Sequence, residues 1–242
     1  MPLVIMRIKV INPNTTASMT EKIGAVARSV ASPGVKIITC NPESGPAVIE
    51  GHYDEALGTV GMLNEIRKGE IEGIDGYVIA CFGDPGLLAA RELAKGPVLG
   101  IAEAAMHAAS FVSTGFSIVT TLGRTRVIAQ RLVDNYGMTQ FCQKVRAIDL
   151  PVLSLETPDA RAAILQECRL ALAEDRCGAI VLGCGGMADL PAQLSQELGI
   201  PVIDGVSVAV KFVEALVGLG LGTSKVGDLA YPTSKSYLGM VR

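Results

Sequence analysis

The sequence predicts an α/β fold with two related halves, each built around a parallel sheet. Residues 76–87 and residues 179–190 carry the same succession of an aliphatic run, a cysteine, glycines, an aspartate and a leucine. Short aliphatic runs that end in glycine and lead into a helical segment are typical of buried parallel strands. The two copies are too far apart for a solenoid repeat of about 20 to 50 residues, so they indicate two halves of similar fold.

The match between the two halves continues beyond the cysteine segments. Residues 96–100 follow the first copy at nearly the interval at which residues 200–205 follow the second. Cys81 and Cys184 therefore stand at equivalent strand ends, and the carboxyl ends of strands carry sites in open α/β sheets. If the halves pack about a pseudo-twofold axis, these strand ends face each other. We expect both cysteines to flank one cleft.

Strands alternate with helices throughout the first half. Asn12 and Pro13 favour a turn after the first strand, and Thr15 or Thr16 can cap the helix that follows. Apolar runs and turn residues set the other boundaries. The predicted elements are strands at 5–11, 35–39, 75–80 and 97–101 and helices at 17–30, about 50–68 and 85–95.

The second half repeats this order after a linking helix at residues 103–113. Its first strand ends in Thr120 and Thr121, and Thr157 with Pro158 is a typical helix start. The predicted elements are strands at 115–121, 144–148, 179–182 and 201–203 and helices at 125–136, 157–175 and about 206–219, with another helix after the second cysteine strand. Residues 223–242 are predicted to form an irregular tail folded back on the body.

A chain of 242 residues can form one large domain or two smaller ones, and the internal repeat favours two. We predict that residues 1–98, with about 206–242, form the first α/β domain and that residues 99–205 form the second. The alternation of strands and helices also predicts parallel sheets with right-handed crossovers.

Composition points to a small-molecule partner. Hydrophobic residues make up 49% of the chain and charged residues 19%, which is typical of a tightly folded protein. A net charge of −3, without a lysine or arginine cluster, argues against nucleic acid or anionic lipid as a partner. Residues 1–10 contain Arg7 and Lys9 and predict a strand, not a signal peptide. The apolar residues 206–221 are too few to span a membrane. A cytoplasmic protein without a membrane partner is therefore expected.

The six cysteines lack the paired C-x-x-C spacing of zinc sites and redox dithiols. Disulfides are not expected without a secretory signal. Cys168 shares a helical face with aliphatic residues, and Cys40, Cys142 and Cys177 have no motif around them, so these four are predicted to be structural. The glycines at 218, 220 and 222 follow a helix instead of opening one, which is a poor dinucleotide fingerprint. No cofactor or metal site is predicted.

Cys81 and Cys184 differ from the other four because each stands where a strand meets a glycine turn. A free cysteine is most often a small buried hydrophobe, which is the alternative for these two as well. Backbone amides and a nearby helix start lower the pKa of a thiol from about 8.5 and favour the thiolate. Two such thiols across one cleft indicate two acid/base catalysts that act on opposite faces of a carbon centre.

Four polar residues occupy matching places in the two halves. Asn14 and Thr15 follow the first strand of the first half, and Thr120 and Thr121 end the first strand of the second half. They can be turn, cap and strand residues only. Their equivalence in the repeat favours a second role, in which they line the cleft and bind carbonyl oxygens. Glu50 and His52 are expected at a helix start, without an assigned role.

Four segments taken together resemble a known family. They are residues 11–15, 50–55, 81–87 and 183–190. In this order they are similar to the hydantoin racemase branch of the aspartate/glutamate racemase superfamily, which includes allantoin racemases. The resemblance covers nearly the whole chain. It implies two pseudo-symmetric Rossmann-like (flavodoxin-like) domains with the active site in the cleft between them, a cofactor-free mechanism, and Cys81 and Cys184 as the catalytic pair. It also implies a homo-oligomer.

The resemblance also implies a substrate pocket, and there the chain departs from the amino-acid racemases of the superfamily. Those enzymes have Asn-Thr after the first cysteine, Thr-His after the second and an aspartate in the first loop. This chain lacks these groups, which suit an ammonium and an α-carboxylate, and an aromatic residue after the first cysteine fits a neutral ring better. The expected substrate-binding residues are Asn14, Thr15, Phe82, Gly83, Thr120, Thr121, Gly185 and Gly186.

The expected function is racemisation at C5 of 5-monosubstituted hydantoins. One thiolate removes the C5 proton, backbone amides and hydroxyls hold the planar enolate, and the other thiol protonates the opposite face. Allantoin is the close alternative, decided by whether the C5 pocket is apolar or binds a ureido group. A cofactor-free decarboxylase, an Asp/Glu-type amino-acid racemase and a non-catalytic binding protein are further alternatives. Redox function is disfavoured because thiols on two faces of a substrate stand beyond bonding distance.

Overall fold

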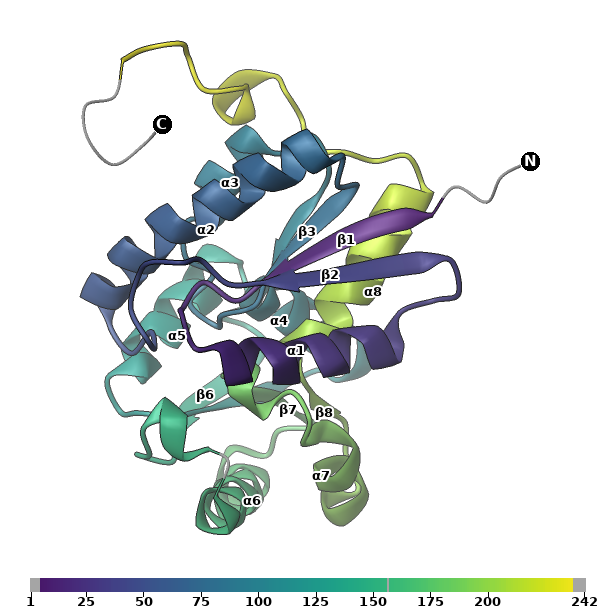
Figure 1. Ribbon diagram of the computed structural model, residues 1–242. Coiled ribbons are helices and arrows are strands. Elements are labelled where there is room, and N and C mark those ends of the chain that lie inside the picture. Colours follow the sequence, from purple (N-terminus) through teal and green to yellow (C-terminus); the bar gives the residue numbers. More distant parts are fainter. Residues whose placement is uncertain (1–4, 156, 237–242) are drawn as a thin grey trace.

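The computed structural model describes residues 5–155 and 157–236 and contains two four-stranded parallel sheets (Figure 1). The strand order is β2-β1-β3-β4 in the first sheet and β6-β5-β7-β8 in the second, so the two halves have the same topology. All the strand pairs are parallel. The predicted α/β fold with an internal repeat is confirmed.

The elements of the first sheet and its helices precede those of the second, except for the last long helix. The first half contains β1 (Met6–Ile11), α1 (Ala17–Val30), β2 (Val35–Cys40), α2 (His52–Glu72), β3 (Gly76–Ile79), α3 (Leu87–Leu93) and β4 (Val98–Gly100). The following part contains α4 (Ile101–Val112), β5 (Phe116–Thr120), α5 (Thr125–Asn135), β6 (Cys142–Ala147), α6 (Pro158–Asp175), β7 (Ala179–Leu182), α7 (Pro191–Leu198), β8 (Val202–Ile203) and α8 (Gly205–Gly218). Short 3-10 helices are η1 (Val152–Ser154), η2 (Gly185–Met187) and η3 (Gly227–Leu229).

The two strands that precede the cysteine segments are central and wholly buried. β3 pairs with β1 and β4, and β7 pairs with β5 and β8. Every residue of β3 and β7 is buried, because helices cover both faces of a parallel sheet. Cys81 and Cys184 each follow their strand by two residues, so the repeat places them at matching sheet edges.

The start of α3 differs from its predicted position at Pro85. Asp84 and Gly86 have positive φ angles of 45° and 68°, which an α-helix does not accommodate, so the helix begins only at Leu87. The helix α2 ends at Glu72, later than the predicted Lys68. Both differences lie at element ends, where local sequence signals are weakest.

The chain returns to the first sheet after leaving the second. The helix α8 packs on α1, α4 and β3, and its Glu214 accepts hydrogen bonds from Ser32 N (2.9 Å) and Ser32 Oγ (2.7 Å). Beyond α8, Thr223 N donates to Lys95 O at 3.1 Å, so the tail does run back over the first half. Residues 237–242 of the predicted tail lie outside the described residues. The division into domains at residues 98 and 206 stays a prediction.

A helix that crosses a bilayer needs about 20 consecutive, mostly apolar residues. Within residues 5–155 and 157–236, every helix is too short or too polar to cross a membrane.

Candidate active site

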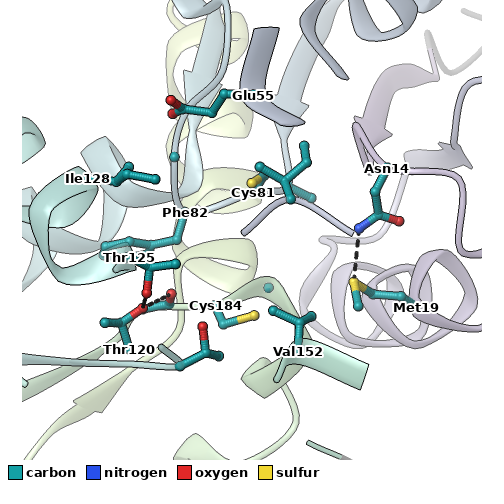
Figure 2. A pocket seen from close by; sticks show the side chains of 16 residues that line it. Asn14, Met19, Glu55, Cys81, Phe82, Thr120, Thr125, Ile128, Val152 and Cys184 are labelled. Carbon is teal, nitrogen blue, oxygen red and sulfur yellow. Dashed lines mark hydrogen bonds between the residues drawn. The ribbon is translucent and has the colours of Figure 1, made fainter. Parts of the chain in front are cut away.

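The carboxyl ends of the central strands of both sheets open onto one pocket (Figure 2). The protein leaves about 570 Å³ unfilled there, part of it open to solvent. Because parallel strands of each sheet end at the same edge, the loops after β1, β3, β5 and β7 all reach it. The pocket is lined by Asn14, Met19, Ile49, Glu55, Ala80, Cys81, Phe82, Gly83, Thr120, Thr121, Thr125, Ile128, Val152, Gly183, Cys184 and Gly185.

Both candidate cysteines line this pocket, one from each half. Cys81 lies in the loop after β3, and Cys184 lies after β7, directly before η2. Figure 2 shows both sulfur atoms within the same pocket. The amide of Gly83 donates to the sulfur of Cys81, and the amide of Gly186 donates to the sulfur of Cys184. The glycine turns thus contact the thiols as the sequence suggested.

The turn amides lower the pKa of each thiol, but the prediction that the pKa values of Cys81 and Cys184 are lowered overall is wrong. Burial raises the pKa of Cys81 to about 12 and that of Cys184 to about 11. Burial destabilises the thiolate by more than one amide hydrogen bond stabilises it. The positive charge of Lys22 also lowers the pKa of Cys184, but by less than burial raises it. Both thiols are therefore protonated at neutral pH, and a thiolate formed here is a strong base.

Six of the eight predicted binding residues line the pocket and two do not. The six are Asn14, Phe82, Gly83, Thr120, Thr121 and Gly185. Thr15 instead donates its hydroxyl to Pro46 O at 3.3 Å, and the N-cap of α1 is Thr16, whose side chain makes no capping hydrogen bond. Gly186 lines a neighbouring cavity beside the pocket. A role for these eight residues in substrate binding stays a prediction.

Asn14 is held so that its amide group faces the pocket. Its Oδ1 accepts from Asn12 Nδ2 (2.9 Å) and from Thr16 N (2.9 Å). Its Nδ2 lies 3.3 Å from the sulfur of Met19, a weak acceptor. A stronger acceptor on a ligand, such as a ring carbonyl, can therefore take this N–H.

Several lining residues could not be found from the sequence patterns. Ile49 lies in a loop, and Ile128 and Val152 come from α5 and η1 of the second half. The residues that flank an apolar side chain in a loop or on a helix do not indicate whether it faces a pocket or the core. Glu55 lies within the segment 50–55 that resembles the family, which is the one signal that could have indicated it.

Glu50 of the first half accepts a hydrogen bond from the second half. Its Oε1 accepts from Val152 N at 2.9 Å, and its own amide donates to Asp54 Oδ2 at 3.0 Å. His52 is largely exposed, with Nδ1 3.3 Å from Glu55 Oε2. Glu50 therefore positions the loop that supplies Val152 to the pocket wall.

Asp84 anchors the turn that carries Cys81. Its buried carboxylate accepts from the amides of Ala102 (3.0 Å) and Glu103 (2.9 Å) at the start of α4, and from Tyr136 Oη (2.8 Å). Its own amide donates to Cys81 O at 3.0 Å. A carboxylate is well placed at a helix N-terminus, where amides lack partners within the helix. This anchor ties the cysteine turn to the second half.

Replacing Asp84 with asparagine should cost about 1–3 kcal/mol of unfolding free energy at about pH 5, because Nδ2 cannot accept from the Glu103 amide. The difference in unfolding free energy between wild type and Asp84→Asn should become smaller as pH rises to about 8. Burial raises the pKa of Asp84 to about 7, although the amides and the Tyr136 hydroxyl lower it. The folded wild type thus holds this proton more tightly than the unfolded chain, and it loses stability as the carboxyl ionises.

Urea unfolding of wild type and Asp84→Asn at several pH values measures this difference. A gap that widens from pH 5 to pH 8 would contradict the raised pKa, because it would mean that the carboxylate form stabilises the fold.

The remaining cysteines lie away from the pocket lining. Cys168 and Cys177 are buried in the core, and Cys40 and Cys142 are half-buried. Burial raises the pKa of Cys40, Cys142 and Cys168 to about 12. All six cysteines of the chain lie among the described residues and are free thiols. Among those residues, no group of three or more His, Cys, Asp or Glu side chains could hold a metal ion.

Comparison with known proteins gives matches over nearly the full chain. The profile of the family described as Asp/Glu/Hydantoin racemase matches residues 8–213. A hydantoin racemase from Rhizobium meliloti is 52% identical over 236 residues, which are 97% of this chain and 98% of the relative. One from Pseudomonas sp. (strain NS671) is 48% identical, with 97% and 95% covered. The structure of allantoin racemase from Klebsiella pneumoniae has 61% identity and a TM-score of 0.95, with 97% and 96% covered.

Proposed function

Because the chain belongs to the Asp/Glu/hydantoin racemase family, we propose that it racemises 5-monosubstituted hydantoins at C5, with Cys81 and Cys184 as the two acid/base catalysts. One observation carries this proposal: two thiols from matching strand ends of two parallel sheets enter a single pocket. Racemisation requires a base on one face of a carbon and an acid on the other, and a repeated fold supplies both from equivalent positions.

The proposed reaction moves one proton in each half-step. A thiolate removes the C5 proton, and the bonding electrons delocalise into the adjacent ring carbonyl to give an enolate. The second thiol then donates its proton to the opposite face of C5. Asn14 Nδ2, which faces the pocket, stabilises the enolate oxygen. The desolvated thiolate is basic enough to attack a carbon acid, although little of it is present at neutral pH.

The wall of the pocket suits a hydantoin with an apolar C5 substituent. Met19, Ile49, Ile128 and Val152 contribute aliphatic or thioether surface, and Phe82 is buried beside Cys81. Apolar surface with a few polar groups is the usual composition of a small-molecule site. These residues favour a ring with a hydrocarbon substituent over a charged amino acid.

Allantoin is the second candidate substrate. One carboxylate, that of Glu55, lines the pocket and can accept N–H groups from a ureido substituent. The similar Klebsiella pneumoniae protein, moreover, is described as an allantoin racemase. Hydantoins and allantoin share the ring and the C5 proton, so both fit the same two-thiol chemistry.

Circular dichroism of separate L- and D-5-benzylhydantoin samples and of (S)-allantoin tests the proposed function. We expect the signals to decay faster than the spontaneous rate, and the ratio of the rates identifies the preferred substrate. Release of carbon dioxide from phenylmalonate, or racemisation of glutamate, would favour the other activities of the superfamily. Unchanged signals for every ureide would overturn the proposal.

The proposed mechanism also predicts how the rate depends on pH. Because burial raises the pKa of Cys81 to about 12 and of Cys184 to about 11, the thiolate fraction increases as pH rises toward those values. The enzymatic kcat/KM should therefore rise about tenfold per pH unit between about pH 6 and pH 9, after the spontaneous rate is subtracted. A plateau below about pH 8 would contradict the raised thiol pKa values.

Assembly and location belong to the proposal as well. A homo-oligomer and a cytoplasmic location are predictions, which sedimentation analysis and cell fractionation can check.

A further inference from the structure

Glu55 is the one charged residue among those that line the pocket in the described part of the chain. The other polar lining groups are the neutral side chains of Asn14, Thr120, Thr121 and Thr125 and the two thiols. No lysine, arginine or histidine lies on this wall among the described residues. A substrate carboxylate would therefore face the carboxylate of Glu55, whose partner cation, Arg131, lies outside the pocket lining.

The carboxylate of Glu55 is fixed in place and mostly shielded from solvent. Both of its oxygens accept from Arg131 Nη2, at 3.1 and 3.2 Å, and its side chain is 12% exposed. Arg131 lies on α5 of the second half, while Glu55 lies on α2 of the first. A carboxylate can accept about four hydrogen bonds, so acceptor capacity remains after these contacts and the one with His52.

The carboxylate of Glu55 lies beside the turn that carries Cys81. A Cβ atom at Gly83 would stand 2.7 Å from Glu55 Oε1, so glycine is what allows the carboxylate to approach. The negative charge of Glu55 also contributes, after burial, to the raised pKa of Cys81. An open groove between α2, α3 and α5 shares both Glu55 and Gly83 with the pocket. Glu55 thus stands where the pocket meets the groove, close to Cys81.

Resting on the proposed function, we infer that Glu55 determines substrate specificity: it accepts N–H groups of neutral cyclic ureides and excludes substrates that carry a carboxylate. Two physical effects act in the same direction. Hydrogen bonds from N–H to a carboxylate are stronger than those to neutral acceptors. A second carboxylate close to Glu55 is repelled, and this repulsion is screened weakly because the Glu55 side chain is 12% exposed.

The Glu55→Gln variant tests this inference, because glutamine keeps the size of the side chain and removes its charge. Calorimetry with racemic 5-benzylhydantoin and with phenylmalonate measures binding separately from turnover. We expect the variant to bind the hydantoin about tenfold more weakly and phenylmalonate about tenfold more tightly than wild type. In kinetics the KM for the hydantoin should rise more than kcat falls.

Arg131→Met is the matched control, since it breaks the same ion pair but leaves the carboxylate in the pocket. We expect it to keep the preference for hydantoin over phenylmalonate. If Glu55 acts only by bridging the two halves, both variants will show the same loss of thermal stability and the same binding, which overturns the inference. Unchanged ligand preference in Glu55→Gln also overturns it.

This experiment separates the inference from the proposed function. Wild type that binds hydantoin but does not racemise it would refute the catalytic proposal and leave the binding comparison intact. Wild type that racemises hydantoins, with a Glu55→Gln variant of unchanged preference, would refute only the role of Glu55.

Discussion

Replacing either Cys81 or Cys184 with serine is expected to lower kcat/KM for hydantoin racemisation by at least about 10³-fold. Positioned acid/base groups contribute factors of about 10² to 10⁴, and a serine hydroxyl is far too weak an acid to take over either role. Each variant removes the catalyst from one face of the substrate only. The thiol that remains can still exchange the C5 proton of one enantiomer with solvent.

Deuterated water makes this one-sided exchange visible. With L- and D-5-benzylhydantoin incubated separately, each variant should incorporate deuterium into one enantiomer without changing its circular dichroism. The two variants should select opposite enantiomers, which assigns each thiol to a face. Cys142→Ser is the matched control, because Cys142 is a half-buried thiol outside the pocket, and it should keep wild-type activity.

Three results would contradict the two-thiol assignment. Full activity in either serine variant would exclude that cysteine from the chemistry. Exchange of the same enantiomer by both variants would mean that the thiols do not serve opposite faces. Loss of activity in Cys142→Ser would show that thiol removal acts through stability and not through the pocket.

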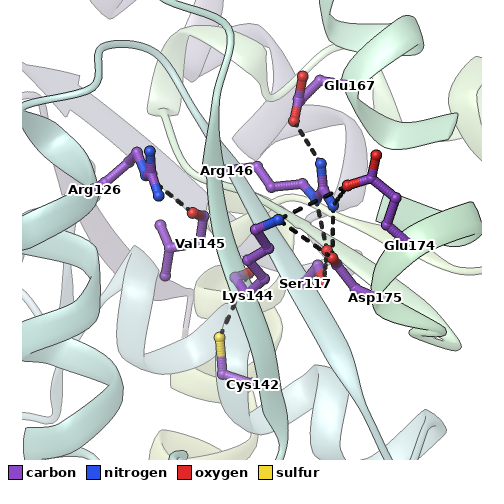
Figure 3. A network of polar contacts seen from close by, with 9 residues as sticks. All are labelled: Ser117, Arg126, Cys142, Lys144, Val145, Arg146, Glu167, Glu174 and Asp175. Carbon is purple, nitrogen blue, oxygen red and sulfur yellow. Dashed lines mark hydrogen bonds and ion pairs between the residues drawn. The ribbon is translucent and has the colours of Figure 1, made fainter. Parts of the chain in front are cut away.

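Replacing Arg146 with methionine is expected to lower the unfolding free energy by about 3–5 kcal/mol. Arg146 lies on β6 and is buried, and it binds Asp175 through Nε (2.6 Å) and Nη2 (2.6 Å), as Figure 3 shows. The carboxylate of Asp175 is also buried, and Ser117 Oγ donates to it at 2.8 Å. Removing the guanidinium would leave a buried carboxylate without its main partner, and losses of this size are typical of such broken pairs.

The pKa of Asp175 depends on the opposing effects of burial and of its hydrogen-bond partners. Burial raises this pKa, but the guanidinium of Arg146 and the hydroxyl of Ser117 outweigh burial and hold it below its usual range. This contribution to stability is present above the pKa of an unfolded aspartate and is lost as pH falls through the lowered value. The difference between wild type and Arg146→Met should therefore shrink in acid.

Urea unfolding at neutral pH and at about pH 3 measures both effects. Glu174→Gln is the control: Glu174 binds the same guanidinium at 2.6 Å but its side chain is 54% exposed, so the change should be small. A loss below about 1 kcal/mol in Arg146→Met would show that the cluster contributes little. Equal losses in the two variants would show that burial of Asp175 is not the cause.

Much of the fold follows from local patterns in the sequence. The aliphatic runs before Cys81 and Cys184 are strands β3 and β7, since four consecutive apolar residues between turn signals have few other places in an α/β protein. The cap-plus-proline start at Thr157 is a real helix start, where Thr157 Oγ1 accepts from Ala160 N at 3.3 Å. These signals act within a few residues, so no tertiary information is needed to recognise them.

Local patterns were less informative where a long-range contact overrides them. The helix α3 begins only at Leu87, after Asp84, which has a positive φ and accepts a hydrogen bond from Ala102 of α4. Thr15 and Thr121 looked equivalent in the repeat, yet Thr121 lines the pocket and Thr15 bonds to Pro46. A repeat preserves the order of elements better than the direction of each side chain.

The sequence by itself determined the α/β class, the repeat and the position of two cysteines at matching strand ends, because hydrophobic periodicity and turn residues are local properties. Only the tertiary structure decided that Glu55, Ile128 and Val152 join the pocket wall, because α2, α5 and η1 meet there through packing between the halves. It also decided the sign of the thiol pKa shifts. Desolvation depends on every atom that surrounds a group, and that environment exists only once the chain has folded.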